Sequence, residues 1–211
     1  DLEDEVEISP TDLDVAAFRV NFSPGERLTV RDLLTALLVS SANDAALALS
    51  RYASGSTENF VKDMNDKAVA LGMRATKFAN PIGFDDPKHY STASDLSKLV
   101  DEFSQHQELL DIVKRQSQPV VSVSGRETRH LTTTNRLLGE RPEIIGLKTG
   151  YTAEAKGSLI ILVDQSEELP RSPRYYSIIL GSRDREQETR QLLDWVKREF
   201  AWTPLEAGPA R

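Results

Sequence analysis

The stretch EIIGLKTGYT, residues 143–152, carries the features on which the interpretation of this chain depends. Its first half is an apolar run that predicts a buried strand. Lys148, Thr149 and Gly150 follow the run directly. A lysine ammonium and a threonine hydroxyl can both bind a carboxylate, and a glycine lets a ligand approach the backbone closely. A structural strand end followed by a glycine turn is the alternative, which the stretch taken alone favours.

The composition limits the classes of function. The chain has 211 residues and a formal net charge of −7, which argues against a nucleic-acid partner. It has no cysteine, so disulfide and zinc-thiolate sites are excluded. The three histidines do not have the spacing of a metal motif, and we expect neither a metal nor a cofactor. No apolar stretch approaches the roughly 20 residues of a membrane span.

The first half of the chain predicts helices. Leucines and valines recur at helical spacing after Thr29, which has the position of a cap with Asp32 three residues later. A second helix is expected to end before Gly72, and Thr92 with Asp95 repeats the capping spacing.

The second half of the chain predicts strands. Two short strands flank Ser124 and Gly125, and three more are expected in EIIGLKTG, GSLIILVDQ and RYYSIILGS, with QSEELPRSPR as a hairpin loop. A helix at about 185–200 closes the chain, with Phe200 on its apolar face. We expect one α+β domain over 1–211, with a mostly helical lobe at about 28–116 and antiparallel strands plus the closing helix at about 117–202.

Two further segments carry polar residues where a structural element should continue or end. SSAND, residues 40–44, interrupts a helical pattern, and Ser41 and Asn43 could relay a proton and hydrogen-bond a ligand. The simpler interpretation is a helix cap by Asn43 or Asp44. Arg183 follows a predicted strand, where a surface ion pair with its acidic neighbours is the simpler interpretation.

The order and spacing of these motifs are more specific than each motif alone. Ser-x-Asn followed about 100 residues later by Lys-Thr-Gly matches much of the signature of penicillin-binding proteins and serine β-lactamases. The flanking sequences resemble the D-alanyl-D-alanine carboxypeptidases of the low-molecular-mass penicillin-binding proteins, from about residue 6 to about residue 200. The stretches that carry this resemblance are PGERLTVRDLLTALLVSSANDAALALS, MNDKAVALGMRATKFANPIGFDDPKHYSTASDLSKL, TTNRLLGERPEIIGLKTGYT and LLDWV.

The resemblance implies a transpeptidase-like fold with an antiparallel sheet, flanking helices and a helical lobe. It implies an enzyme that removes the terminal D-alanine from peptidoglycan stem peptides through an acyl-serine intermediate. Partners would be a peptide ending in D-Ala-D-Ala and, as covalent inhibitors of the complete enzyme, β-lactams. The location would be extracytoplasmic, in the periplasm or cell envelope.

The resemblance also implies roles for particular residues. Ser41 would pass a proton to the departing amine, Asn43 would bind the substrate amide, and Lys148 would supply positive charge. The substrate carboxylate and carbonyl would be held by the remaining positions, which are Thr149, Gly150, Tyr151 through its backbone N–H, and Arg183.

One family motif is absent from the sequence. The family nucleophile is the serine of Ser-x-x-Lys, and none of the nine lysines has a serine three residues before it. We therefore expect a fragment of a carboxypeptidase, inactive as given, that begins after the helix with the nucleophile. A non-catalytic peptidoglycan-binding or interaction module is the alternative, and a serine β-lactamase fits less well.

Overall fold

The structure is a computed structural model that describes residues 1–164 and 174–201. Short elements open the chain, five α-helices follow, and strands alternate with turns up to a last helix. The elements are β1 (Glu5–Glu7), η1 (Pro10–Leu13), β2 (Arg27–Thr29), α1 (Val30–Ser40), α2 (Asn43–Ser54), α3 (Thr57–Ala70), α4 (Ala93–Phe103), α5 (Gln107–Val113), β3 (Ser117–Val121), β4 (Thr128–Thr132), β5 (Ile144–Thr152), β6 (Lys156–Val163), β7 (Tyr175–Ser182) and α6 (Arg185–Glu199).

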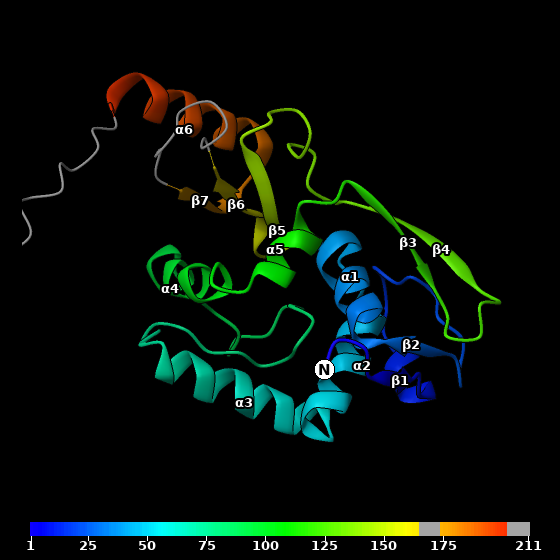
Figure 1. The fold of residues 1–211 in the computed structure, drawn as a ribbon. Helices are drawn as coiled ribbons and strands as arrows, with labels where there is room; N and C mark the ends of the chain where they lie inside the picture. Colours follow the sequence, from blue (N-terminus) through cyan, green and yellow to red (C-terminus); the bar gives the residue numbers. More distant parts are fainter. Residues whose placement is uncertain (165–173, 202–211) are drawn as a thin grey trace, which may run out of the picture.

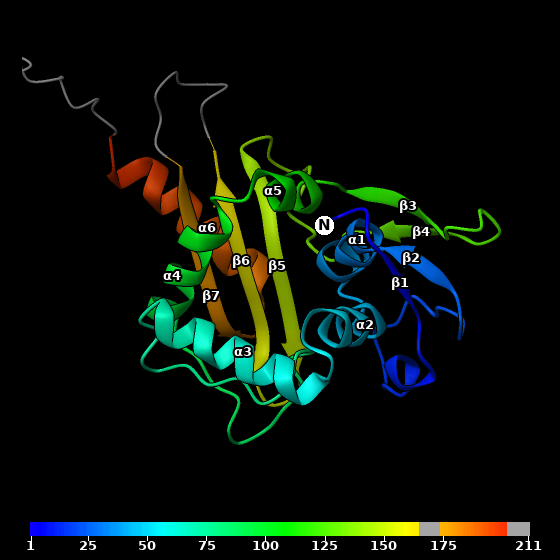
Figure 2. The same ribbon diagram turned by 60° about the horizontal axis from the view of Figure 1, so that its bottom comes forward.

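An antiparallel sheet in the order β5-β6-β7 forms the centre of the fold. The helix α6 covers one face of this sheet, and α4 and α5 lie against the other face (Figure 1). The helices α1 and α2 lie beyond the β5 side of the sheet (Figure 2). The predicted α+β class is confirmed, and β5 is the edge strand nearest to α1 and α2 (Figure 2).

Strand β6 shows why the sheet is covered on both faces. Leu159, Ile161 and Val163 alternate along it and are almost fully buried with Leu193 of α6. Ile160 and Leu162, the intervening residues, belong to a second cluster with residues of α4 and α5. Successive side chains of a strand point to opposite faces, so an unbroken apolar run fills two cores at once.

Strand β5 contains a bulge just before its polar end. Its pairing with β6 shifts register between Ile144 and Gly146. A Cβ atom on Gly146 would lie 2.5 Å from the carbonyl oxygen of Val113, so only glycine lets β5 pass the end of α5. Beyond the bulge the strand continues through Gly150 to Thr152, two residues past the predicted segment EIIGLKTG.

Several local predictions can be compared with the structure. The caps at Thr29 and Thr92 are confirmed, because each hydroxyl accepts from the backbone N–H three residues later. Phe200 is an exception, since it is 51% exposed and contacts Trp195 edge-on instead of entering the core. Strands β1 and β2 were not predicted, and most of the expected loop QSEELPRSPR lies outside the described residues. None of the helices in the described ranges is both long and apolar enough for a membrane span.

Candidate active site

The junction between α1 and α2 is built around Ser41. Helix α1 ends at Ser40, and Ser41 takes the left-handed conformation with φ 59° and ψ 40°. Helix α2 then begins at Asn43 after the N-cap residue Ala42, which has no side-chain hydrogen bond to the helix. The prediction that Asn43 or Asp44 caps α2 is therefore wrong, and their buried side chains serve other contacts.

The Ser41 hydroxyl faces the ammonium of Lys148. Lys148 Nζ lies 2.6 Å from Ser41 Oγ and 2.9 Å from the carbonyl oxygen of Thr149. Burial, together with the nearby positive charge of Arg185, lowers the pKa of Lys148 to about 8. The two motifs are thus in direct contact in the structure, through a hydrogen bond along which a proton can pass.

A cavity of about 430 Å³ opens beside this pair. Six of the seven predicted residues line it: Ser41, Asn43, Lys148, Thr149, Gly150 and Tyr151. Thr149 is only 8% exposed, whereas Tyr151 is 62% exposed and can meet a ligand. A Cβ atom on Gly150 would find its nearest neighbour at 3.8 Å, so packing within the chain does not require a glycine there.

Arg183 is the predicted residue that the structure does not bring to the cavity. It is exposed and is not among the residues that line the cavity, whereas Arg185 is. Asp184 caps α6 by accepting from the N–H of Gln187, and Arg185 follows as the first helical residue. Arg185 Nη1 donates to the carbonyl oxygen of Gly150 at 2.6 Å, which holds the guanidinium at the strand end.

A strained loop lies against the first residues of α2, and no pattern in the sequence predicted it. Ala17, Phe18 and Asn21 all have positive φ, which is unfavourable for residues other than glycine. Asn43 holds the loop from one side, through its N–H to Phe18 O at 2.7 Å and its Nδ2 to Ala17 O at 3.2 Å. The carboxylate of Asp44 accepts the N–H groups of Val20 and Asn21 at 3.1 and 3.0 Å. The loop thus places Phe18 at the cavity.

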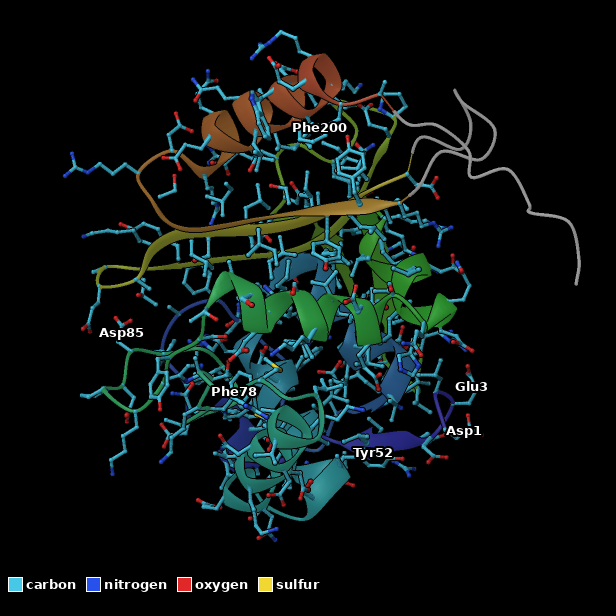
Figure 3. The ribbon with its side chains drawn as sticks, turned by 90° about the vertical axis from the view of Figure 1, so that its left-hand side faces the viewer. Asp1, Glu3, Tyr52, Phe78, Asp85 and Phe200 are labelled. Atoms are coloured by element: carbon cyan, nitrogen blue, oxygen red, sulfur yellow. The ribbon has the colours of Figure 1, made fainter. Side chains whose placement is uncertain are left out.

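A second loop forms the opposite wall, between α3 and α4. Phe78, Phe84 and His89 of this loop line the cavity. Burial lowers the pKa of His89, so the imidazole is held toward its neutral form. Asp85 accepts a hydrogen bond from Thr152 Oγ1 at 2.5 Å and so ties the loop to the end of β5. Figure 3 shows Phe78 and Asp85 on this loop, below the tip of the β5–β6 hairpin.

The cavity offers cations, hydroxyls and amides to a ligand. Across the described residues, no group of three or more His, Cys, Asp or Glu side chains could hold a metal ion. The arrangement can bind an anionic group at Lys148, Thr149 and Arg185, and it can move a proton between Ser41 and Lys148.

Comparison with known proteins gives a consistent result. The sequence profile described as D-alanyl-D-alanine carboxypeptidase matches residues 1–169. The carboxypeptidase DacF of Bacillus subtilis is 30% identical over 207 residues, covering 97% of this chain and 52% of that protein. DacC of Escherichia coli is 32% identical over 189 residues, which cover 84% of this chain and 43% of that protein.

A solved structure agrees with these relatives. The Streptomyces K15 DD-transpeptidase has a TM-score of 0.83 at 28% identity, covering 94% of this chain and 80% of that one. The chain spans about half the length of the curated relatives that it matches.

Proposed function

The chain belongs to the D-alanyl-D-alanine carboxypeptidase family, and on that premise we propose that it forms the proton-transfer and carboxylate-binding part of a serine-type D-Ala-D-Ala carboxypeptidase. The observation that carries this proposal is the 2.6 Å contact between Lys148 Nζ and Ser41 Oγ. It joins two motifs that lie 107 residues apart in the sequence. A structural turn and a structural strand end would not need this contact.

In the proposed reaction, Ser41 passes a proton to the departing D-alanine amine. Lys148 is suited to replenish that proton because its pKa is lowered to about 8. The side chain of Asn43 hydrogen-bonds the substrate amide, and the backbone N–H of Tyr151 stabilises the oxyanion that forms at the carbonyl.

The terminal carboxylate of the substrate is held by Thr149 and a cation. The sequence suggested Arg183 for this role, and the cavity lining supports Arg185 instead. Lys148 adds charge to the same region, so a substrate with a free carboxylate is favoured over one without.

We place the nucleophile outside these 211 residues, because no serine of the chain precedes a lysine by three positions. We propose peptidoglycan stem peptides as substrates, β-lactams as covalent inhibitors of the full-length protein, and the cell envelope as the location. The missing motif also favours a second candidate, a non-catalytic module that binds the same peptides.

The substitution Ser41→Ala in the full-length protein tests the proposal. Loss of a positioned proton donor should lower the rate of D-alanine release by about 10²–10⁴-fold. Ser56→Ala is the matched control, because Ser56 caps α3 and is not among the residues that line the cavity. The rate is measured by release of D-alanine from an acylated D-Ala-D-Ala peptide. Equal rates in the two variants would remove Ser41 from the reaction.

A fluorescent penicillin separates the two candidate functions. The 211-residue chain should not be labelled, because an acyl adduct needs an activated nucleophile. The full-length protein should be labelled on a serine outside this chain. A full-length protein that binds D-Ala-D-Ala peptides but takes no label would support the non-catalytic module, and an adduct on Ser41 would contradict its assigned role.

A further inference from the structure

Thr134 lies between the two halves of the candidate site. It follows β4, and its backbone N–H donates to the carbonyl oxygen of Val39, near the end of α1, at 3.1 Å. Its side chain lines the cavity, and its Oγ1 lies 2.6 Å from Oγ1 of Thr149. One residue thus contacts both the helix that leads to Ser41 and the strand that carries Thr149.

The position of Thr134 is fixed by its neighbours. The N–H of Thr133 donates to Gln116 O at 2.8 Å, and the hydroxyl of Thr133 accepts from the N–H of Asn135 at 3.2 Å. Asn135 is 4% exposed, and its Oδ1 accepts from the N–H of Leu137 at 3.0 Å. Thr134 therefore stands in a braced turn, which gives its hydroxyl a defined place beside Thr149.

The direction of the hydrogen bond between Thr134 and Thr149 decides whether Thr149 can donate to a ligand. A threonine hydroxyl has one proton to donate and lone pairs that accept. If Thr149 donates its proton to Thr134, only lone pairs of Thr149 face the cavity, and these repel a carboxylate. If Thr134 donates to Thr149, the proton of Thr149 is free for the ligand.

The two cations of the cavity also donate hydrogen bonds to the protein itself, which bears on the need for the Thr149 proton as a donor to a carboxylate. Lys148 already donates to Ser41 Oγ and to Thr149 O. Arg185 already donates to Gly150 O through Nη1 and to Glu186 through Nε. Both cations thus have some of their N–H donors turned to protein acceptors, and the Thr149 hydroxyl is a further donor that a carboxylate can use.

We propose that Thr134 is a positioning residue, whose hydroxyl donates to Thr149 and so directs the Thr149 proton toward a ligand carboxylate. This inference rests on the proposed function, because it assumes that Thr149 binds the carboxylate. Thr134 does not touch the ligand itself. It sets the preference for a free carboxylate over an uncharged end group, which is the selectivity that a carboxypeptidase requires.

The test measures that preference directly in the 211-residue chain. The probes are N-acetyl-D-alanyl-D-alanine and its C-terminal amide, titrated into ¹⁵N-labelled protein and followed by NMR. The readout is the ratio of the two dissociation constants. Thr134→Val keeps the shape and removes the hydroxyl, and it should lower the preference for the acid by about three- to tenfold, the size of one hydrogen bond. Thr134→Ser keeps the hydroxyl and should stay within about twofold of the wild type.

Thr149→Val is the reference variant, which distinguishes a failure of the proposed carboxylate site from a failure of the role of Thr134. Equal binding of acid and amide by the wild-type chain, or binding of neither, overturns the proposed carboxylate site and this inference together. An unchanged preference in Thr149→Val has the same meaning. If Thr149→Val loses the preference and Thr134→Val keeps it, only the role of Thr134 is overturned. An equal loss in Thr134→Ser and Thr134→Val assigns Thr134 to packing and also overturns it.

Discussion

Two helix junctions in this chain solve the same geometric problem in different ways. Helices α1 and α2 are joined through Ser41, and helices α2 and α3 are joined through Gly55. Both residues are left-handed, with φ 59° at Ser41 and φ 77° at Gly55. At the second junction Ser56 then caps α3 by accepting from the N–H of Asn59. At the first junction the N-cap residue of α2 is Ala42, which makes no side-chain hydrogen bond to the helix.

The second junction follows local preferences and the first does not. Glycine tolerates the left-handed region, whereas another L-residue there costs about 1–2 kcal/mol. Ser41 bears that cost at the point where its hydroxyl meets Lys148. Departures from local preference concentrate at functional sites, because the surrounding structure maintains them for the chemistry. We therefore interpret the α1–α2 junction as part of the candidate site and the α2–α3 junction as a structural connection.

The largest effect on stability is expected from Asp44, which supports the first junction. Asp44 is fully buried, and its carboxylate accepts the N–H groups of Val20 and Asn21. Asp44→Ala should lower the free energy of unfolding by about 2–4 kcal/mol, because two hydrogen bonds to a buried charged group are lost. Urea unfolding measures this value.

Asp63→Ala is the matched control at the second junction. Asp63 also accepts a hydrogen bond, from Ser54 Oγ at 2.6 Å, but the contact is exposed. We expect a loss below about 1 kcal/mol. Equal losses in the two variants would contradict the view that the first junction depends on tertiary contacts and the second on local ones.

The same contrast explains how much could be predicted from the sequence. Helices and strands followed from apolar spacing, and Ser41 with Lys148 followed from two motifs in a known order. Ser and Asn also favour caps, so SSAND alone could not reveal its role. The loop at Ala17–Asn21 was missed because its conformation rests on Asp44, which is 23 and 24 positions away from the residues that it binds. Arg185 was missed because two arginines flank Asp184, and only the capped helix start decides which one faces the cavity.

The next largest effect is a dependence of the free energy of unfolding on pH, caused by Lys148, which contacts Ser41 at the first junction. The pKa of Lys148 is about 8 in the folded chain, below its ordinary 10.5. The unfolded chain therefore binds more protons between these values, and the folded state gains stability as pH rises through that window. At about 1.4 kcal/mol per unit, the gain is at most about 3 kcal/mol. The variant Lys148→Met should lack it.

The measurement is urea unfolding at a series of pH values from 7 to 10.5, read as the difference between wild type and variant. Lys88→Met is the control, because Lys88 is exposed on the loop between α3 and α4. Its profile should run parallel to that of the wild type. A Lys148→Met profile that is also parallel would show that burial of the ammonium does not govern this region.

The smallest effect compares the two left-handed residues directly. Ser41→Gly removes the cost of the left-handed conformation in the folded state, but it also raises the conformational entropy of the unfolded chain. From these two effects alone we expect a net stabilisation of about 0.5–1 kcal/mol. In the wild type it also removes the hydrogen bond to Lys148, which is worth about 1.5–3 kcal/mol as a contact to a charged group. We therefore expect Ser41→Gly to destabilise the wild type and to stabilise a Lys148→Met background, as measured by urea unfolding in a double-mutant cycle.

Gly55→Ser is the reciprocal control: a Cβ atom there meets nothing within 4 Å, so its cost is conformational alone and should be about 0.5–1 kcal/mol in both backgrounds. If Ser41→Gly changed stability equally in the two backgrounds, the contact with Lys148 would not be what keeps a serine in the left-handed position.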